Sequence, residues 1–201
     1  MKRIEISVLA ALIFSIVLSM CTLETECGQI RESVLRLHVL ANSDSGADQE
    51  LKLKVRDRLL EVSGEIYAGC GTKEEAIAAT RDNLEMLTSE AEEVIRASGF
   101  RYPVSISLDE SYFNTRTYGN VTLPAGNYQA VKVIIGEGKG HNWWCVMFPP
   151  LCVAPASDAA SLDDVLTREQ MELVECDEYE IKFKCVELYE EFRRYLAGKS
   201  E

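Results

Sequence analysis

Basic residues are scarce in this chain of 201 residues, which has 21 lysines and arginines against 33 aspartates and glutamates. The formal net charge is -12, and no run of lysine or arginine interrupts the acidic composition. Such a surface repels phosphate backbones and anionic lipid headgroups. We therefore expect no nucleic-acid partner.

Patterns typical of metal sites and catalysis are also scarce. The chain has two histidines and no C-x-x-C pair, so neither a zinc site nor a catalytic thiol is indicated. The glycine-rich segment 136–140 lacks the spacing of nucleotide-binding loops and is typical of a hairpin turn between two strands. Asp44 and Asp48 precede or begin a predicted helix, where capping explains them, and His38 is interpreted as a packing residue. We predict no catalytic, cofactor or metal site, and a protein that is not an enzyme.

The N-terminus has the features of an export signal, because Lys2 and Arg3 precede the apolar stretch 6–20. This stretch is shorter than the roughly 20 apolar residues of a spanning helix, which favours cleavage near Cys21 over permanent anchoring. A short uncleaved anchor is one alternative. Lipidation of Cys21 is another, although Met20 stands where a small residue is expected. We expect residues 1–21 to be a signal peptide or a short N-terminal membrane anchor.

Cysteine is the main candidate for covalent cross-linking, since export leads to an environment in which disulfides persist. If Cys21 is lost with the signal, the six remaining cysteines allow 15 complete pairings, and the sequence does not choose among them. Cys145 and Cys152 flank a Pro-Pro turn. We predict a disulfide bridge between them. The loss of loop entropy in the unfolded chain predicts a stabilisation of about 2.5 kcal/mol for such a bridge. The pairing of the other four is left open: Cys27, Cys70, Cys176 and Cys185.

The hydrophobic pattern predicts one α+β domain over residues 34–196. A strand at 34–40 is followed by two long helices, one starting near Gly46 and one over 72–99, each preceded by a capping-box pattern. The sheet is expected to be mixed or antiparallel, with 143–148 placed centrally because it is apolar on both faces. Further predicted elements are strands at 104–108, 128–135 and 179–185, a short helix at 162–173 and a C-terminal helix at 186–196.

Two blocks have an unusual composition for a scaffold. The first contains RLHVLANSDS at 36–45, DQ at 48–49 and LKLKVRD at 51–57. The second contains TRTYG at 115–119, LPAGNY at 123–128 and GEGKGHNWWCVMFPPLC at 136–152. Together these blocks resemble the stage II sporulation protein R family of endospore-forming bacteria, and the resemblance covers about residues 34–196. Asn114 departs from the proline that the family is expected to carry before Thr-Arg.

The resemblance implies a signal that is made in the forespore and exported into the space between the forespore and mother-cell membranes. There it activates a membrane-embedded aspartic protease, which removes the pro-sequence of pro-sigma-E. Such an activator works by binding and needs no nucleophile. One alternative is an exported hydrolase acting on cell wall or peptide. Another is a purely structural envelope protein, in which both blocks are buried.

We place the protease-contact surface at polar or amphipathic residues of the two blocks, because strand-end loops are where a rigid scaffold presents functional groups. The residues are Asn42, Asp44, Arg116, Tyr118 and Asn142. The alternative for each is a turn or capping bond inside the protein. Trp143 and Trp144 point to opposite sides of one strand, so we expect one in the core and one as a candidate contact anchor.

Overall fold

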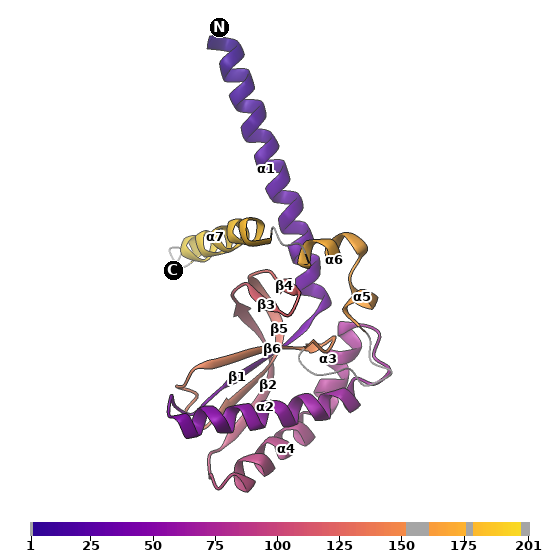
Figure 1. The fold of residues 1–201 in the computed structure, drawn as a ribbon, viewed down its shortest axis with the longest axis vertical. Coiled ribbons are helices and arrows are strands. Elements are labelled where there is room, and N and C mark those ends of the chain that lie inside the picture. The colour runs from indigo at the N-terminus through magenta and orange to yellow at the C-terminus, as the bar shows by residue number, and fades with distance from the viewer. Residues whose placement is uncertain (1, 152–160, 176–178, 198–201) are drawn as a thin grey trace.

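A four-stranded mixed sheet lies at the centre of the protein, in the strand order β2-β5-β1-β6 (Figure 1). β1 pairs parallel with β5 and antiparallel with β6, and β2 pairs antiparallel with β5. This computed structural model describes residues 2–151, 161–175 and 179–197, and it confirms the α+β fold with a mixed sheet. The strands of the sheet are β1 (Leu35–Leu40), β2 (Val104–Phe113), β5 (Gly126–Ile135) and β6 (Asn142–Phe148).

Helices cover one whole face of the sheet and enclose the main core, which includes Leu37, Val55 and Val133. The helix that follows β1 begins at Gly46 as predicted, because the Ser45 side chain accepts a 3.1 Å hydrogen bond from the Asp48 N–H. These helices are α2 (Gly46–Ile66), α3 (Lys73–Asp82) and α4 (Leu84–Ala97).

The single helix predicted over 72–99 is wrong, because the chain breaks between α3 and α4 at Asn83. The Asn83 side-chain amide donates to the carbonyl oxygen of Ala79 at 2.8 Å. A side-chain bond of this kind competes with the regular backbone bond to the residue four positions earlier. The Thr72 cap at the start of α3 is present as expected, accepting from the Glu75 N–H.

Part of the other sheet face is covered by short elements and by the C-terminal end of the N-terminal helix. A second core forms there around Ile30, Phe113, Tyr128 and Val146. The predicted helix over 162–173 is divided in two, because Thr167 starts a new helix with a capping box. The covering elements are α1 (Lys2–Ser33), the β-hairpin of β3 (Arg116–Tyr118) and β4 (Val121–Leu123), α5 (Leu162–Val165) and α6 (Arg168–Val174).

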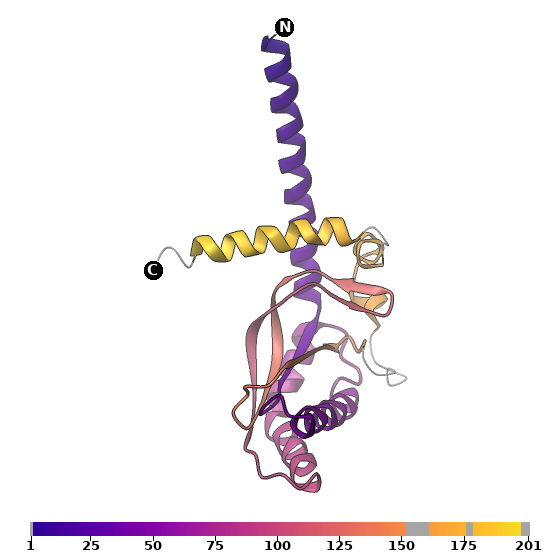
Figure 2. The same cartoon turned by 60° about the vertical axis from the view of Figure 1, so that its left-hand side comes forward.

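The final strand predicted over 179–185 is wrong, because this segment is the start of a long helix, α7 (Tyr179–Ala197). The alternation of apolar and polar residues from Tyr179 to Cys185 is typical of a strand. Phe183 and Val186 nevertheless lie three residues apart on one buried helix face, which packs near Cys27 of α1. α7 runs crosswise to α1 in both views of the molecule (Figures 1 and 2).

The central placement predicted for β6 is also wrong, since among the described strands it pairs with β1 alone and forms an edge. β6 is apolar on both faces because Cys145 and Met147 enter the main core while Val146 enters the second one. β1 lies between β5 and β6, so the glycine segment 136–140 is not a hairpin turn. It crosses the end of β1 instead.

Candidate functional site

The two sequence blocks meet where the glycine segment crosses the end of β1. The N–H groups of Lys139 and Gly140 donate to the carbonyl oxygens of Asn42 (3.2 Å) and Ala41 (2.9 Å). The Glu137 N–H donates to Asn42 Oδ1 at 3.0 Å. We call this arrangement of residues 41–45 and 136–141 the loop cluster.

Glycine is required in the loop cluster by close contact and by backbone conformation. A Cβ on Gly140 would lie 2.2 Å from the carbonyl oxygen of Ser43. Gly136 has a φ of +60°, and a Cβ there would lie 2.3 Å from Asn42 Oδ1. Positive φ angles are present at Gly136 and Gly138 but not at Gly140, and they serve a crossing and not a hairpin.

The Asp48 side chain stabilises the loop cluster through hydrogen bonds. Its carboxylate accepts hydrogen bonds from Ser43 Oγ at 2.5 Å and from Asn42 Nδ2 at 2.9 Å. These two bonds hold the pKa of Asp48 below its usual value, because they stabilise the charged form. Lys52 adds a further tie by donating from Nζ to the carbonyl oxygen of His141 at 2.8 Å.

Asp44 and His141 form a pair at the surface of the loop cluster. Asp44 Oδ1 accepts from the His141 N–H at 2.6 Å and lies 2.5 Å from its ring Nδ1. The bond to the His141 side chain lowers the pKa of Asp44. The side chains of Asp44 and His141 are 55% and 79% exposed, so this pair is solvated. It links the two segments of the loop cluster. Within the described part of the chain, no group of three or more His, Cys, Asp or Glu residues is placed to hold a metal ion.

Next to the loop cluster, no helix of the described residues lies over the second sheet face, opposite α2 and α4 (Figure 2). His38 pairs with Trp144 and Leu40 pairs with Asn142, so these four side chains share this face. The ring of His38 lies 6.0 Å from those of Phe113 and Trp144, and burial lowers the pKa of His38. We call the partly exposed residues here the open sheet face: His38, Leu40, Lys132, Ile134, Asn142 and Trp144.

The five predicted contact residues differ in exposure. Asp44, Arg116 and Asn142 are exposed, and the Arg116 guanidinium carbon lies 4.7 Å from the centroid of the Trp144 ring. Asn42 and Tyr118 are half-buried. Both bonding groups of the Asn42 amide are used inside the loop cluster.

Tyr118 supports Arg36, a buried arginine of β1. The alternation of apolar residues in β1 predicted only that Arg36 lies on the face opposite the main core. Arg36 is fully buried, with its guanidinium carbon 4.1 Å from the Phe113 ring centroid and 4.8 Å from that of Tyr128. It donates to the Tyr118 hydroxyl, which in turn donates to the carbonyl oxygen of Trp144 at 3.3 Å. Sequence reasoning missed this role of Arg36, because the covering hairpin of β3 and β4 was not predicted.

The two tryptophans divide as expected. Trp144 packs partly against the second core, whereas Trp143 is 37% exposed on the opposite side of β6. The Arg56 guanidinium carbon lies 4.3 Å from the centroid of the Trp143 ring. Trp143 is therefore the exposed member of the pair, and it faces away from the open sheet face.

Complete pairing of the six cysteines is excluded, because several cysteines have free thiols. Cys145 is buried in the middle of β6. Cys152 and Cys176 lie outside the described residues, so the bridge from Cys145 to Cys152 stays a prediction. The free thiols within the described residues belong to Cys21, Cys27, Cys70 and Cys185.

Comparison with known proteins agrees with the motif blocks. Residues 31–158 match the family model described as stage II sporulation protein R, and this range contains the whole sheet and the loop cluster. The chain is 36% identical over 140 residues to the stage II sporulation protein R of Bacillus subtilis (strain 168), which covers 70% of this chain and 62% of that protein. The chain thus spans less than two thirds of that relative. No solved structure matches it. The chain belongs to the stage II sporulation protein R family.

Proposed function

We propose that this chain is an exported sporulation signal that activates the membrane-embedded aspartic protease which processes pro-sigma-E. Membership of the family implies a role in sporulation, and the family is one of signalling proteins. The observation that carries the proposal is the match over residues 31–158, which contains both motif blocks. These blocks meet in the loop cluster beside the open sheet face.

Export is supported by the first helix. Within the described residues, α1 is the one helix whose length and apolar composition suffice to cross a membrane. Its apolar side chains near the N-terminus, such as Ile4, Leu12 and Phe14, are more than half exposed. Residues 1–21 therefore serve as signal or anchor, and the domain of residues 34–196 acts in the space between the forespore and mother-cell membranes.

The contact surface consists of the loop cluster, the open sheet face, and Arg116 and Tyr118 of β3, which contact Trp144 beside that face. Asp44, Arg116 and Asn142 make direct contact with the protease, while Asn42 and Tyr118 take part by holding that surface in shape. An activator shifts its target by binding one conformation better than another. A surface that keeps its shape suits this task, because little ordering free energy is lost on binding.

Co-expression tests the proposed activity directly. The protease and pro-sigma-E are produced together in a host that lacks sporulation genes, with or without this chain exported to the same membrane. We expect the pro-sequence to be removed only when the chain is present. Equal cleavage in both cultures would remove the proposal.

Point variants test the contact surface. Arg116→Ala and Asn142→Ala should strongly reduce cleavage at unchanged export and melting temperature, because both side chains are exposed. Tyr118→Ala should lower the melting temperature as well, because it removes a partner of buried Arg36. Arg96→Ala on α4 is the matched control and should retain cleavage. If Arg116→Ala behaves like this control, the contact lies elsewhere.

A further inference from the structure

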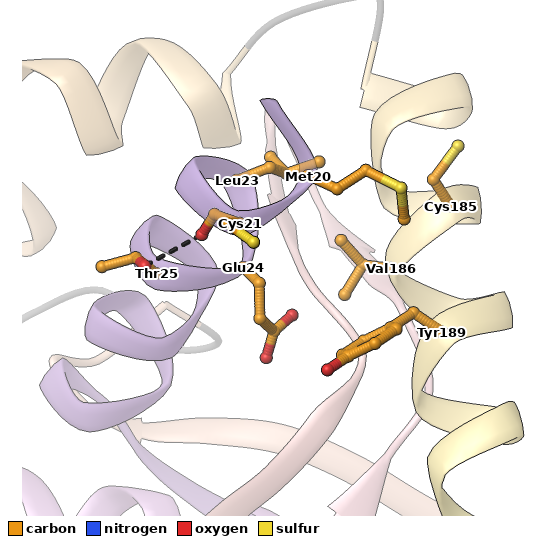
Figure 3. A pocket seen from close by; sticks show the side chains of 8 residues that line it. All are labelled: Met20, Cys21, Leu23, Glu24, Thr25, Cys185, Val186 and Tyr189. Carbon is orange, nitrogen blue, oxygen red and sulfur yellow. Dashed lines mark hydrogen bonds between the residues drawn. The ribbon is translucent and has the colours of Figure 1, made fainter. Parts of the chain in front are cut away.

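α7 crosses α1 at the point where the exposed apolar part of α1 ends. Met20 points from α1 toward α7, and Val186 and Tyr189 point back toward α1 (Figure 3). Together with neighbouring residues they line a cavity of about 540 Å³, most of whose lining side chains are apolar. α7 therefore lies at the level of residues 20–25 of α1.

One face of α7 is attached to the domain. Phe183 and Val186 are buried beside Cys27, and Glu187 Oε1 accepts a 3.3 Å hydrogen bond from the Thr115 N–H. The sheet lies on this side of α7, and the N-terminal half of α1 extends on the other (Figure 2). The opposite face of α7 is consequently turned toward the space around the apolar half of α1.

That opposite face carries exposed apolar side chains. Leu188 is 59% exposed and Tyr195 is 60% exposed, and residues seven positions apart lie on the same side of a helix. The described side chains of α1 from Ile4 to Met20 are exposed as well. Two helices thus present apolar residues on the same side of the domain.

The charge of α7 differs from that of the rest of the chain. Its sequence contains four acidic and four basic residues, so the helix has no net charge, whereas the whole chain has a charge of -12. The general repulsion between this acidic protein and anionic headgroups is therefore weaker along α7 than for the chain as a whole. Aromatic residues with a polar tip, such as Tyr195, are enriched at membrane interfaces.

We infer that α7 lies on the surface of the bilayer that the apolar half of α1 enters, with Leu188 and Tyr195 at the headgroup boundary. An amphipathic helix parallel to the membrane plane fits this position next to a crosswise apolar helix. Such contact at two helices fixes how the domain faces the membrane. The inference does not depend on which protein the domain activates.

A tryptophan placed on α7 tests the contact. Full-length Leu188→Trp is reconstituted into vesicles of phosphatidylcholine and phosphatidylglycerol, and the background from Trp143 and Trp144 is taken from the unsubstituted chain. We expect the added emission to be shifted to shorter wavelength and to be quenched when brominated phospholipids replace the ordinary ones. Met86→Trp is the control, because Met86 is exposed on α4 at the far side of the domain. Its emission should not respond to bromine.

Two results would overturn the inference. In the first, the protein is bound to the vesicles, but brominated phospholipids quench the emission of Leu188→Trp no more than that of Met86→Trp. The second is a chain that does not float with the vesicles at all.

Leu188→Glu provides a second measurement. In the vesicle-bound protein it should increase the rate of amide hydrogen exchange along α7, while circular dichroism without vesicles stays unchanged. Leu188→Met, which keeps an apolar side chain, should retain the slow exchange. Equal exchange in the two variants would argue against bilayer contact, and exchange that depends on protein concentration would assign this face to a second copy of the chain.

Discussion

At the scale of single residues, the loop cluster shows why a motif residue can be interpreted either as an internal hydrogen-bonding residue or as a partner contact until the fold is known. Asn42 uses its side-chain oxygen to hold the N–H of Glu137, a residue 95 positions away, and its side-chain nitrogen to bind Asp48. Neither partner is visible in the local pattern around Asn42. The sequence could single out this residue, but it could not tell an internal bond from a contact with a partner.

Gly140→Ala should destabilise the domain by about 2 kcal/mol, because the added Cβ would overlap the carbonyl oxygen of Ser43 and overpacking of this kind costs roughly 1–3 kcal/mol. Urea unfolding of the purified protein measures the loss. Gly46→Ala is the matched control, since nothing lies within 4 Å of its Cβ and its φ is not in the left-handed region. It should leave the stability unchanged or slightly raised. Equal effects of the two substitutions would contradict the packing of the loop cluster.

Asp48→Asn should reduce the free energy of unfolding at neutral pH by about 1.5 kcal/mol, because hydrogen bonds to a charged group are lost or weakened. The folded protein lowers the pKa of Asp48, so its carboxylate stabilises the fold above the ordinary aspartate pKa of about 3.9. This contribution disappears as the pH falls through the lowered value.

The difference between wild type and Asp48→Asn should therefore shrink below about pH 4. Denaturant unfolding at a series of pH values checks this. Asp82→Asn, a substitution of an exposed aspartate at the end of α3, should change stability little at any pH. A difference for Asp48→Asn that is constant down to acid pH would show that its charge is not the cause.

At the scale of helices and strands, the sequence pattern located β1, α2, β5 and β6 well and the first half of β2, because these segments have sustained apolar patterns. It failed where a short local pattern competed with the packing of distant segments. β3 and β4 have three residues each, too few for any period. The edge position of β6 follows from its pairing with β1, which the apolar composition of β6 does not encode.

The turn that follows β6 carries a prediction of its own. Cys145 should be bridged to Cys152, with a Cα separation below roughly 7 Å, because the Pro-Pro turn brings the two segments together. Peptide mapping of exported protein under non-reducing conditions should recover both cysteines in one linked peptide pair. Cys70, which is a free thiol, should be alkylated in the same sample. Alkylation of Cys145 and Cys152 without prior reduction would contradict the bridge.

At the scale of the whole molecule, α1 has two parts that differ in burial. Its described side chains up to Met20 are exposed, whereas Cys27 and Ile30 near its end are fully buried in the domain. The boundary between the segment that we propose to serve export and the folded domain therefore lies inside one continuous helix. A domain limit read from composition alone, such as residue 34, omits a part of the helix that belongs to the core.

Deletion of residues 1–20 should abolish signalling but leave the melting temperature of the remainder unchanged, because that segment contributes nothing to the core. An unrelated export signal in its place should restore activity. Deletion of residues 1–33 is the contrasting variant and should destabilise the domain by several kcal/mol, because buried Cys27 and Ile30 are lost. If the exchanged signal exports the protein without restoring activity, residues 1–20 do more than transport.

The central position of β1 also bears on when the chain is able to fold. Leu37 pairs with Val131 on one side and with Cys145 on the other, so both neighbours of β1 are synthesised long after it. Contacts this distant in sequence slow folding, since a long loop must close before they form. The sheet therefore stays open until most of the polypeptide has left the ribosome. If the chain is exported unfolded through a secretion channel, in line with the proposed function, this topology delays compaction until translocation is under way.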